Sequence, residues 1–141
     1  MASTKQTKVL KKIEMLRDRR LQLADLEVSR ANAAVEQANR KVSAADQMLN
    51  RTDEFCRNEH RRLNDELASG AATGKDGLFA WRNAHEKLQE RLKTAKDRLA
   101  NAKVELQSEQ SRLEQIKAKR RTDALAVERL KVLQAPVQRG N

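Results

Sequence analysis

The feature that most constrains this chain is a seven-residue period of large and small side chains, which runs through two separate stretches. In the first stretch, a large residue recurs every seven positions from Leu21, and a series that begins with four alanines lies three positions further on. These two series are Leu21, Val28, Val35, Val42, Leu49, Cys56 and Leu63, and Ala24, Ala31, Ala38, Ala45, Thr52 and Glu59. The corresponding series of the second stretch are Leu78, His85, Leu92, Leu99, Leu106 and Leu113, and Trp81, Leu88, Ala95, Ala102, Glu109 and Ile116. Such heptads predict helices that pack along one narrow seam.

One short break separates the two stretches, "LASGAATGKDGLFAW" at residues 67–81, and it contains three of the four glycines. Gly70 suits the left-handed turn that ends a helix, and either Thr73 or Asp76 can cap the next helix. Pro136 is expected to stop that second helix. The predicted elements are a helix over about 4–68, a loop over about 69–75, a helix over about 76–134 and a tail over 135–141. The fold class expected is all-α, a single long antiparallel helical hairpin that forms a two-stranded coiled coil.

Composition supports this fold class. With 35% charged and 2% aromatic residues, the chain has too few large apolar side chains for the core of a multilayer globular protein. Residues 1–141 are therefore expected to form one helical domain. The segment Met1–Gln6 lacks the apolar core of a signal peptide, and no apolar run approaches the roughly 18 residues that cross a bilayer. We expect a cytoplasmic protein without membrane insertion, and the single cysteine fits a reducing compartment.

Size complementarity predicts the register of the hairpin. If the residue numbers of paired positions add up to about 144, nearly every layer of the seam sets a large side chain against a small one. The predicted layers are Leu63 with Trp81, Cys56 with Leu88, Leu49 with Ala95, Ala45 with Leu99, Val42 with Ala102, Ala38 with Leu106 and Ala31 with Leu113. Near the termini the seam is polar instead, with Arg17, Arg20, Arg120 and Asp123. Leu10, Ile13 and Leu16 join it only if the heptad slips by a stutter, so this end is expected to be the weaker one.

Positive charge is concentrated in the two terminal segments. Residues 1–20 and 117–141 each hold seven Lys or Arg against two acidic residues, whereas the sixteen basic and sixteen acidic residues of 21–116 cancel. A hairpin would gather the net charge of +10 at the end away from the loop. The simpler interpretation is that these charges aid solubility. The more specific one is that they engage an acidic partner, through Lys5, Lys8, Lys11, Lys12, Arg19, Arg20, Lys117, Lys119, Arg120 and Arg121.

Nucleic acid is the competing acidic partner. The basic segments carry no interleaved aromatic residues for base stacking, and the sequence contains no DNA-binding or RNA-binding motif. Phosphate contacts at low salt would be non-specific. We therefore expect no specific nucleic-acid partner.

The sequence contains no evident catalytic or cofactor-binding constellation, so we expect neither enzyme activity nor a cofactor. The "GKD" at 74–76 departs from a Walker A motif, which requires Ser or Thr after the lysine. Cys56 and His60 lie one helical turn apart. The predicted register brings Glu59 and His85 near them, which would be a conceivable zinc constellation. We favour the alternative, a polar layer of Glu59 and His85 that fixes the register, and assign no metal ligands.

The two aromatic residues after the loop have different expected roles. Trp81 lies on the seam opposite Leu63, where it would fasten the closed end of the hairpin. Phe79 lies one position beyond the seam residue Leu78, so part of its ring is expected to stay exposed. Exposed aromatic rings commonly anchor partners, and Phe79 with Leu78 and Arg82 is therefore a candidate docking patch.

The basic, heptad-rich hairpin and the glycine-containing loop followed by "GLFAWRNAHEKL" resemble the FliJ/YscO/HrpO family of bacterial type III secretion and flagellar export proteins. The resemblance covers nearly the whole chain as architecture and composition. Proteins of this family are similar in shape to the γ-subunit stalk of rotary ATPases. The resemblance implies a non-catalytic central stalk on the cytoplasmic side of a secretion apparatus. Its terminal end would enter the hexameric secretion ATPase and promote its assembly or activity, and its loop side would contact the export gate or secretion chaperones.

The resemblance also implies which residues meet these partners. The ATPase end would comprise Lys8, Leu10, Lys11, Lys12, Ile13, Leu16, Arg19, Arg20, Lys117, Lys119, Arg120, Arg121, Val127, Leu130 and Leu133. The loop end would comprise Leu78, Phe79, Trp81, Arg82, His85 and Leu88. The alternatives are a cytoplasmic coiled-coil adaptor or chaperone escort without ATPase contact, and a basic nucleic-acid-associated coil. Self-association through Val9, Leu23 and Leu26 is a further alternative.

Overall fold

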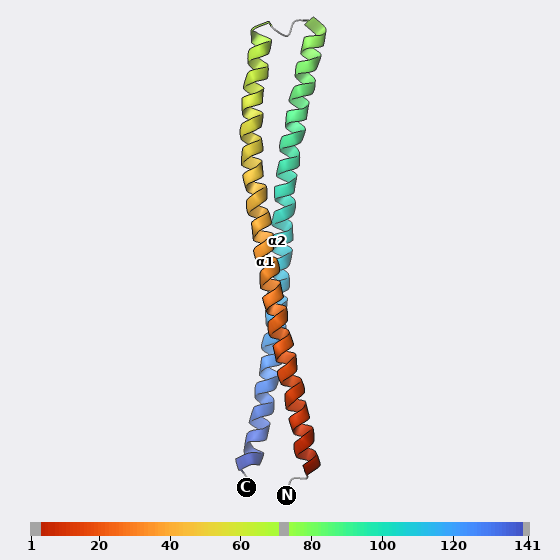
Figure 1. Ribbon diagram of the computed structural model, residues 1–141, viewed down its shortest axis with the longest axis vertical. Helices are drawn as coiled ribbons and strands as arrows, with labels where there is room; N and C mark the ends of the chain where they lie inside the picture. Colours follow the sequence, from red (N-terminus) through yellow and green to blue (C-terminus); the bar gives the residue numbers. More distant parts are fainter. Residues whose placement is uncertain (1–3, 71–73, 140–141) are drawn as a thin grey trace. The chain divides into compact units, whose positions relative to one another are not determined.

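The chain is an all-α helical hairpin of two antiparallel helices, α1 (Thr4–Ala68) and α2 (Gly74–Arg139) (Figure 1). The computed structural model describes residues 4–70 and 74–139, with side chains described up to residue 133. Within these ranges there is no strand. The predicted fold class is therefore confirmed. Neither described helix contains a stretch apolar enough to span a membrane.

The first helix ends where the sequence predicted. The backbone N–H of Ser69 donates to the Asp65 carbonyl at 2.9 Å, and the N–H of Gly70 donates to the Leu67 carbonyl at 3.3 Å. Gly70 has φ +75°, the left-handed conformation that only glycine adopts without strain. A Cβ at Gly70 would meet no atom within 4 Å, so this glycine is required for its backbone conformation and not for space.

The second helix differs from the prediction at both ends. It begins at Gly74, two residues earlier than expected, and Gly74 has φ +86°. Asp76 lies in the first turn, where its negative charge faces the positive end of the helix dipole. Thr73, the other candidate cap, lies outside the described residues.

The predicted end of the second helix, with a non-helical tail from residue 135, is wrong. The helix continues through Pro136 to Arg139. Within the predicted tail, residues 140–141 lie outside the described residues. Proline removes one backbone donor and crowds one carbonyl, but the residues after it can still donate to the turn before. Because Pro136 lies in the last turn of α2, its effect is confined to one turn and does not end the helix.

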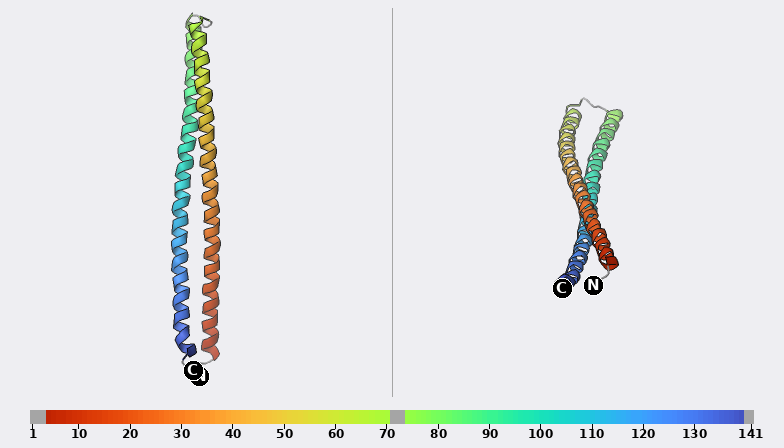
Figure 2. Two further views of the ribbon diagram at one scale, coloured as in Figure 1. Left: turned by 90° about the vertical axis from the view of Figure 1, so that its left-hand side faces the viewer. Right: turned by 60° about the horizontal axis from the view of Figure 1, so that its bottom comes forward.

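The helix pair is divided into two compact units. Unit 1 comprises residues 1–36 and 108–141, and unit 2 comprises residues 37–107, including the connection between the helices. In each unit a segment of α1 lies beside a segment of α2, as the two views of Figure 2 also show.

Unit 2 has the predicted register. The Cys56 Sγ donates to the Leu88 carbonyl at 3.5 Å, and these residue numbers add up to 144. The Lys41 Nζ lies 3.1 Å from Glu105 Oε1, and this pair adds up to 146. The seam contains both large and small apolar side chains. Its most buried members are Ala38, Cys56, Leu88, Ala95 and Leu99, and Cys56 is 2% exposed. Size complementarity was therefore a correct guide to the register here.

Unit 1 keeps the same register but has a more polar seam. Its buried apolar residues are Ala24, Ala31, Leu113 and Val127. The Arg17 guanidinium donates to the Ala126 carbonyl at 3.0 Å, and the Arg120 Nε donates to Asp25. The residue numbers of these two pairs add up to 143 and 145, so α1 and α2 continue in the register seen in unit 2.

The heptad of unit 1 continues to Glu14 without the stutter that would bring Leu10, Ile13 and Leu16 together onto the seam. Glu14 and Arg17, which lie seven residues before Leu21 and Ala24, are half-buried. Leu10, Ile13 and Leu16 are exposed instead. The Arg17 guanidinium reaches the Ala126 carbonyl on α2 from its position on this seam.

Candidate functional site

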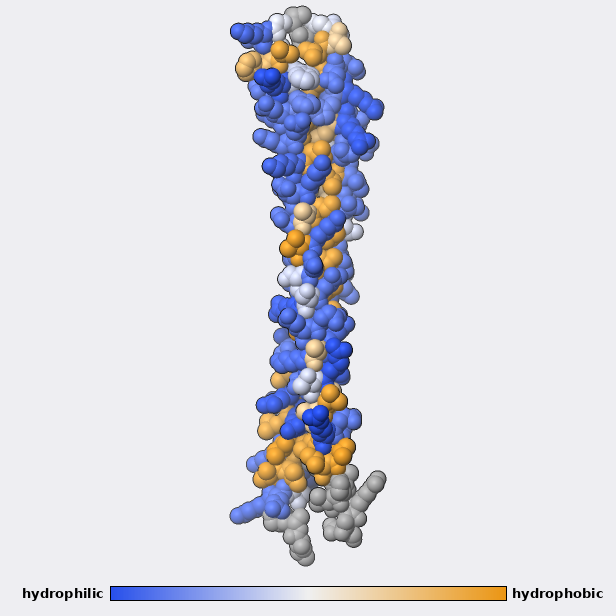
Figure 3. All heavy atoms as spheres, turned by 180° about the vertical axis from the view of Figure 1, so that it is seen from behind, coloured by the Kyte–Doolittle hydropathy of each residue, from blue (hydrophilic) through white to orange (hydrophobic). Residues whose placement is uncertain are grey.

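Exposed apolar and basic side chains gather on the terminal part of unit 1, which we call the basic-apolar surface. Its exposed large apolar residues are Val9, Leu10, Ile13, Met15, Leu16, Leu125, Val132 and Leu133. Its exposed basic residues are Lys8, Lys11, Lys12, Arg19, Arg20, Lys119 and Arg121. Apolar side chains are visible in the lower part of Figure 3, close to hydrophilic ones. Leu16 is 61% exposed and Leu133 is 71% exposed, and exposed apolar residues that group together mark candidate interaction surfaces.

The structure places most residues of the predicted ATPase end on this surface, but not all of them. Lys117, Arg120 and Leu130 are half-buried. Val127 is buried between the helices, so it supports the hairpin and is not accessible to a partner. The Arg120 side chain is also committed to Asp25. Lys119, although exposed, lies 4.0 Å from Glu27.

Four exposed apolar residues of this surface, Val9, Met15, Leu125 and Val132, were not among those that the sequence predicted for the terminal end. Val9 was considered only for self-association. A signal for them was present, because none of the four lies on the heptad seam that continues from the central part of each helix. Large apolar residues off a seam are the ones that a two-helix coil leaves in contact with water.

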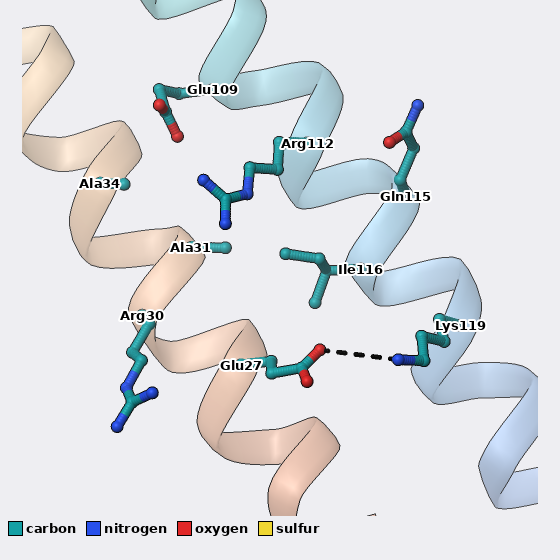
Figure 4. Close-up of a pocket in the computed structure, with 9 residues that line it drawn as sticks. All are labelled: Glu27, Arg30, Ala31, Ala34, Glu109, Arg112, Gln115, Ile116 and Lys119. Atoms are coloured by element: carbon teal, nitrogen blue, oxygen red, sulfur yellow. Dashed lines mark ion pairs between the residues drawn. The ribbon is translucent and has the colours of Figure 1, made fainter.

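Unit 1 also contains a shallow groove of about 620 Å³ between α1 and α2 (Figure 4). Ala31 and Ala34 leave space on the α1 side, and Glu109, Arg112 and Ile116 line the α2 side. One carboxylate oxygen of Glu109, Oε2, is buried without a hydrogen-bond partner among the described residues. A carboxylate in that position weakens the seam because it loses water without gaining a donor. The groove is thus explained by the packing of small and charged residues.

A second exposed patch lies in unit 2 at the start of α2, and we call it the Phe79 surface. It consists of Leu78, Phe79 and Arg82, all of which are exposed, with Phe79 at 62%. Trp81 is half-buried; its Nε1 donates to Asn64 Oδ1 at 3.2 Å, which ties the start of α2 to α1. The sequence predicted this difference between the two aromatic residues. Leu78, predicted on the seam, is exposed.

The remaining residues of the predicted loop end take part in packing between the helices. His85 is half-buried and stacks on Trp81, with ring centroids 5.2 Å apart. Leu88 is buried and its carbonyl accepts the Cys56 thiol, so it is not accessible to a partner. Burial raises the pKa of the Cys56 thiol above its usual value, with a smaller contribution from Asp53, against the lowering effect of Arg91. This thiol is therefore poorly suited to act as a nucleophile.

The polar layer and the zinc constellation suggested by the sequence take a different form in the structure. Glu59 bonds to Arg62 at 2.9 Å on its own helix and does not pair with His85. His85 instead meets His60, with their Nδ1 atoms 2.9 Å apart. Over residues 4–70 and 74–139, no three His, Cys, Asp or Glu side chains come together in a group that could hold a metal ion. The prediction of a Glu59–His85 layer was wrong because Arg62, one helical turn away, satisfies Glu59 locally.

Comparisons with known proteins found no matching family model, no matching characterised protein and no matching solved structure. The function is accordingly inferred from the chain's own surfaces. What these surfaces can do chemically is bind, because the basic-apolar surface and the Phe79 surface both present apolar side chains beside positive charge. Both are exposed on helices, where they are open to a second protein.

Proposed function

We propose that this chain is a non-catalytic protein-interaction hairpin, a stalk-like component of a bacterial type III secretion or flagellar export apparatus. In this proposal the basic-apolar surface binds the hexameric secretion ATPase and promotes its assembly or turnover. The Phe79 surface binds the export gate or a secretion chaperone. The choice of apparatus follows the resemblance to the FliJ/YscO/HrpO family.

The observation that carries the proposal is the basic-apolar surface itself. Exposed apolar residues as large as Leu16 and Leu133 cost free energy in water, roughly 25 cal/mol for each Å² left uncovered. A partner that covered them would recover that free energy, whereas solubilisation alone accounts only for the basic residues. The surface therefore favours a docking role over a purely solubilising one.

The positive charge of unit 1 indicates the sign of the charge expected on a partner's surface. Unit 1 contains sixteen basic and nine acidic residues, a net charge of +7, and unit 2 contains fourteen basic and eleven acidic residues, a net charge of +3. The Lys8, Lys11 and Lys12 side chains are exposed beside the apolar ones. Such an arrangement favours an acidic partner surface with an apolar centre, and it would speed association at low ionic strength.

The polar seam of unit 1 fits a segment that is stabilised by its partner. Glu14 and Arg17 occupy positions that hold apolar residues elsewhere in the heptad. The helix pair therefore gains less from its own packing here, and binding would add stability in proportion to the partner's affinity. A stalk that docks into a ring needs this kind of adaptable end.

The proposal is tested with the purified secretion ATPase encoded in the same genome as this chain. ATPase assembly is followed by light scattering, and ATP turnover is measured with and without the chain at physiological salt. We expect the chain to increase both, and the double variant Leu16→Ser, Leu133→Ser to bind roughly tenfold to hundredfold more weakly, because two apolar anchors are lost. Both residues are exposed, so helicity should be unchanged.

The matched control is the double variant Met48→Ser, Val104→Ser, which removes two exposed apolar side chains from unit 2. It should act like the unchanged chain. Equal loss in both double variants would show that binding depends on general hydrophobicity. Absence of any effect on the ATPase, with retained capture of an export chaperone through Phe79, would favour the alternative role as an adaptor or chaperone escort.

A further inference from the structure

Two imidazole rings face each other across the helix pair of unit 2. His60 on α1 and His85 on α2 have Nδ1 atoms 2.9 Å apart and ring centroids 4.3 Å apart. They are the only two histidines of the chain, and the fold brings them together from positions 25 residues apart. Both side chains are half-buried, so the pair is in contact with water.

The surroundings hold the two rings in place. The Nε2 of His85 lies 3.2 Å from Nε2 of Gln89. The Trp81 ring stacks on the His85 ring. Trp81 is itself tied to α1 through Asn64. The position of His85 is therefore fixed by neighbours on both helices, and the pair is preorganised for a common ligand.

The contact between the two Nδ1 atoms has a simple chemical requirement. For a hydrogen bond between neutral imidazoles, one nitrogen carries the proton and the other accepts it. A metal ion can take the place of that proton, which moves to Nε2 of the same ring, because the ion accepts a lone pair from each Nδ1. Two nitrogen ligands at about 2.0–2.1 Å from a tetrahedral ion lie roughly 3.3 Å apart. The gap between His60 and His85 would need to widen by only a few tenths of an ångström.

We propose that His60 and His85 form a two-histidine site for a divalent transition metal ion, which would link α1 to α2 within unit 2. No third His, Cys, Asp or Glu completes a cluster there among the described residues, so water supplies the other ligands. Imidazole ligands select Ni²⁺, Cu²⁺ or Zn²⁺ over Mg²⁺ and Ca²⁺, which prefer oxygen. The proposal stands on this geometry alone and is independent of the proposed role in secretion.

The test uses the full chain without an added histidine tag, and the probe is Ni²⁺. Ni²⁺ is chosen because it does not oxidise the Cys56 thiol. Trp81 is the only tryptophan and stacks on His85, so its fluorescence reports occupancy of the site. We expect saturable quenching, one ion per chain by calorimetry, and a higher melting temperature with Ni²⁺. Either His60→Gln or His85→Gln should weaken binding about 100-fold, because the second ligand acts intramolecularly.

The controls separate this site from other ligands. Cys56→Ser should leave Ni²⁺ binding unchanged, and Mg²⁺ should give no quenching. The helicity of each histidine variant is measured without metal, and His85→Asn replaces His85→Gln if helicity is lost. Binding that is unaffected by both histidine substitutions, quenching that does not saturate, or loss of binding in Cys56→Ser would each overturn the proposal.

Discussion

Unit 2 and the terminal part of unit 1 follow the same heptad, yet they use it in opposite ways. In unit 2 most seam positions are apolar, with Cys56 and Leu88 buried, while most polar residues face water. In unit 1 the seam takes in Glu14 and Arg17, while Leu16 is left exposed. The register is the same in both, so the difference arises from which residues occupy the seam positions.

The comparison shows that a continuous helical period does not imply uniform stability. An apolar seam stabilises its unit from within, whereas a polar seam beside exposed apolar residues leaves part of the available stabilisation to a partner. Unit 2 is stabilised mainly by its own seam, whereas the end of unit 1 leaves large apolar side chains exposed. Four substitutions test this contrast, beginning with the one that should have the largest effect.

Replacing Leu88 with Ala should destabilise unit 2 most. It removes a buried side chain from the seam and leaves a cavity beside Cys56, which should lower the free energy of unfolding by about 3 kcal/mol. Urea denaturation followed by circular dichroism measures this loss. The reaction of the Cys56 thiol with a thiol reagent should become faster, since it reports local opening. Leu78→Ala, at an exposed position, is the control and should change little.

Replacing Glu109 with Leu should stabilise unit 1 by about 1–2 kcal/mol. The substitution removes a buried carboxylate oxygen without a hydrogen-bond partner and fills part of the groove beside Ala31 and Ala34. The melting temperature measures the gain. Glu114→Leu, on the exposed side of the same helix, should give no comparable increase. A lower melting temperature for Glu109→Leu would mean that Glu109 has a partner that compensates for its burial.

Replacing Arg17 with Ala should destabilise the terminal part of unit 1 by about 1 kcal/mol, because the Ala126 carbonyl loses its side-chain donor. Amide hydrogen exchange near residue 126 is the local measurement. Arg19→Ala removes the same charge at an exposed position and is the matched control. If Arg17→Ala and Arg19→Ala have equal effects, net charge and not the bond to Ala126 governs the stability of this end.

Replacing Lys41 with Ala should have the smallest effect, below about 0.5 kcal/mol. Its ion pair with Glu105 joins the two helices of unit 2, but the side chains are 52% and 49% exposed, so water and salt screen the attraction. A double-mutant cycle with Glu105→Ala isolates the pair. A coupling above 1 kcal/mol would show that ion pairs, and not the apolar seam, distinguish unit 2 from unit 1.

The sequence was a sufficient guide where packing is decided by side-chain size. Alternation of Ala and Leu fixed the register, and Gly70 fixed the end of α1, because both depend on local steric rules. It was insufficient where polar side chains choose among several partners. Glu59 pairs with Arg62, and His85 contacts His60. Both contacts depend on side-chain rotamers, which the heptad does not specify. Helix continuation through Pro136 likewise depends on its position within the last turn.

The proline inside α2 has a consequence for the chemistry of the basic-apolar surface. Pro136 has no N–H, so the Val132 carbonyl, four residues before it, lacks the donor that a helix normally supplies. This carbonyl belongs to the same turn as the exposed Val132 and Leu133 side chains. A docking molecule that donated one amide or hydroxyl proton to this carbonyl would be held in a defined orientation. Apolar contact alone is non-directional and would not fix that orientation.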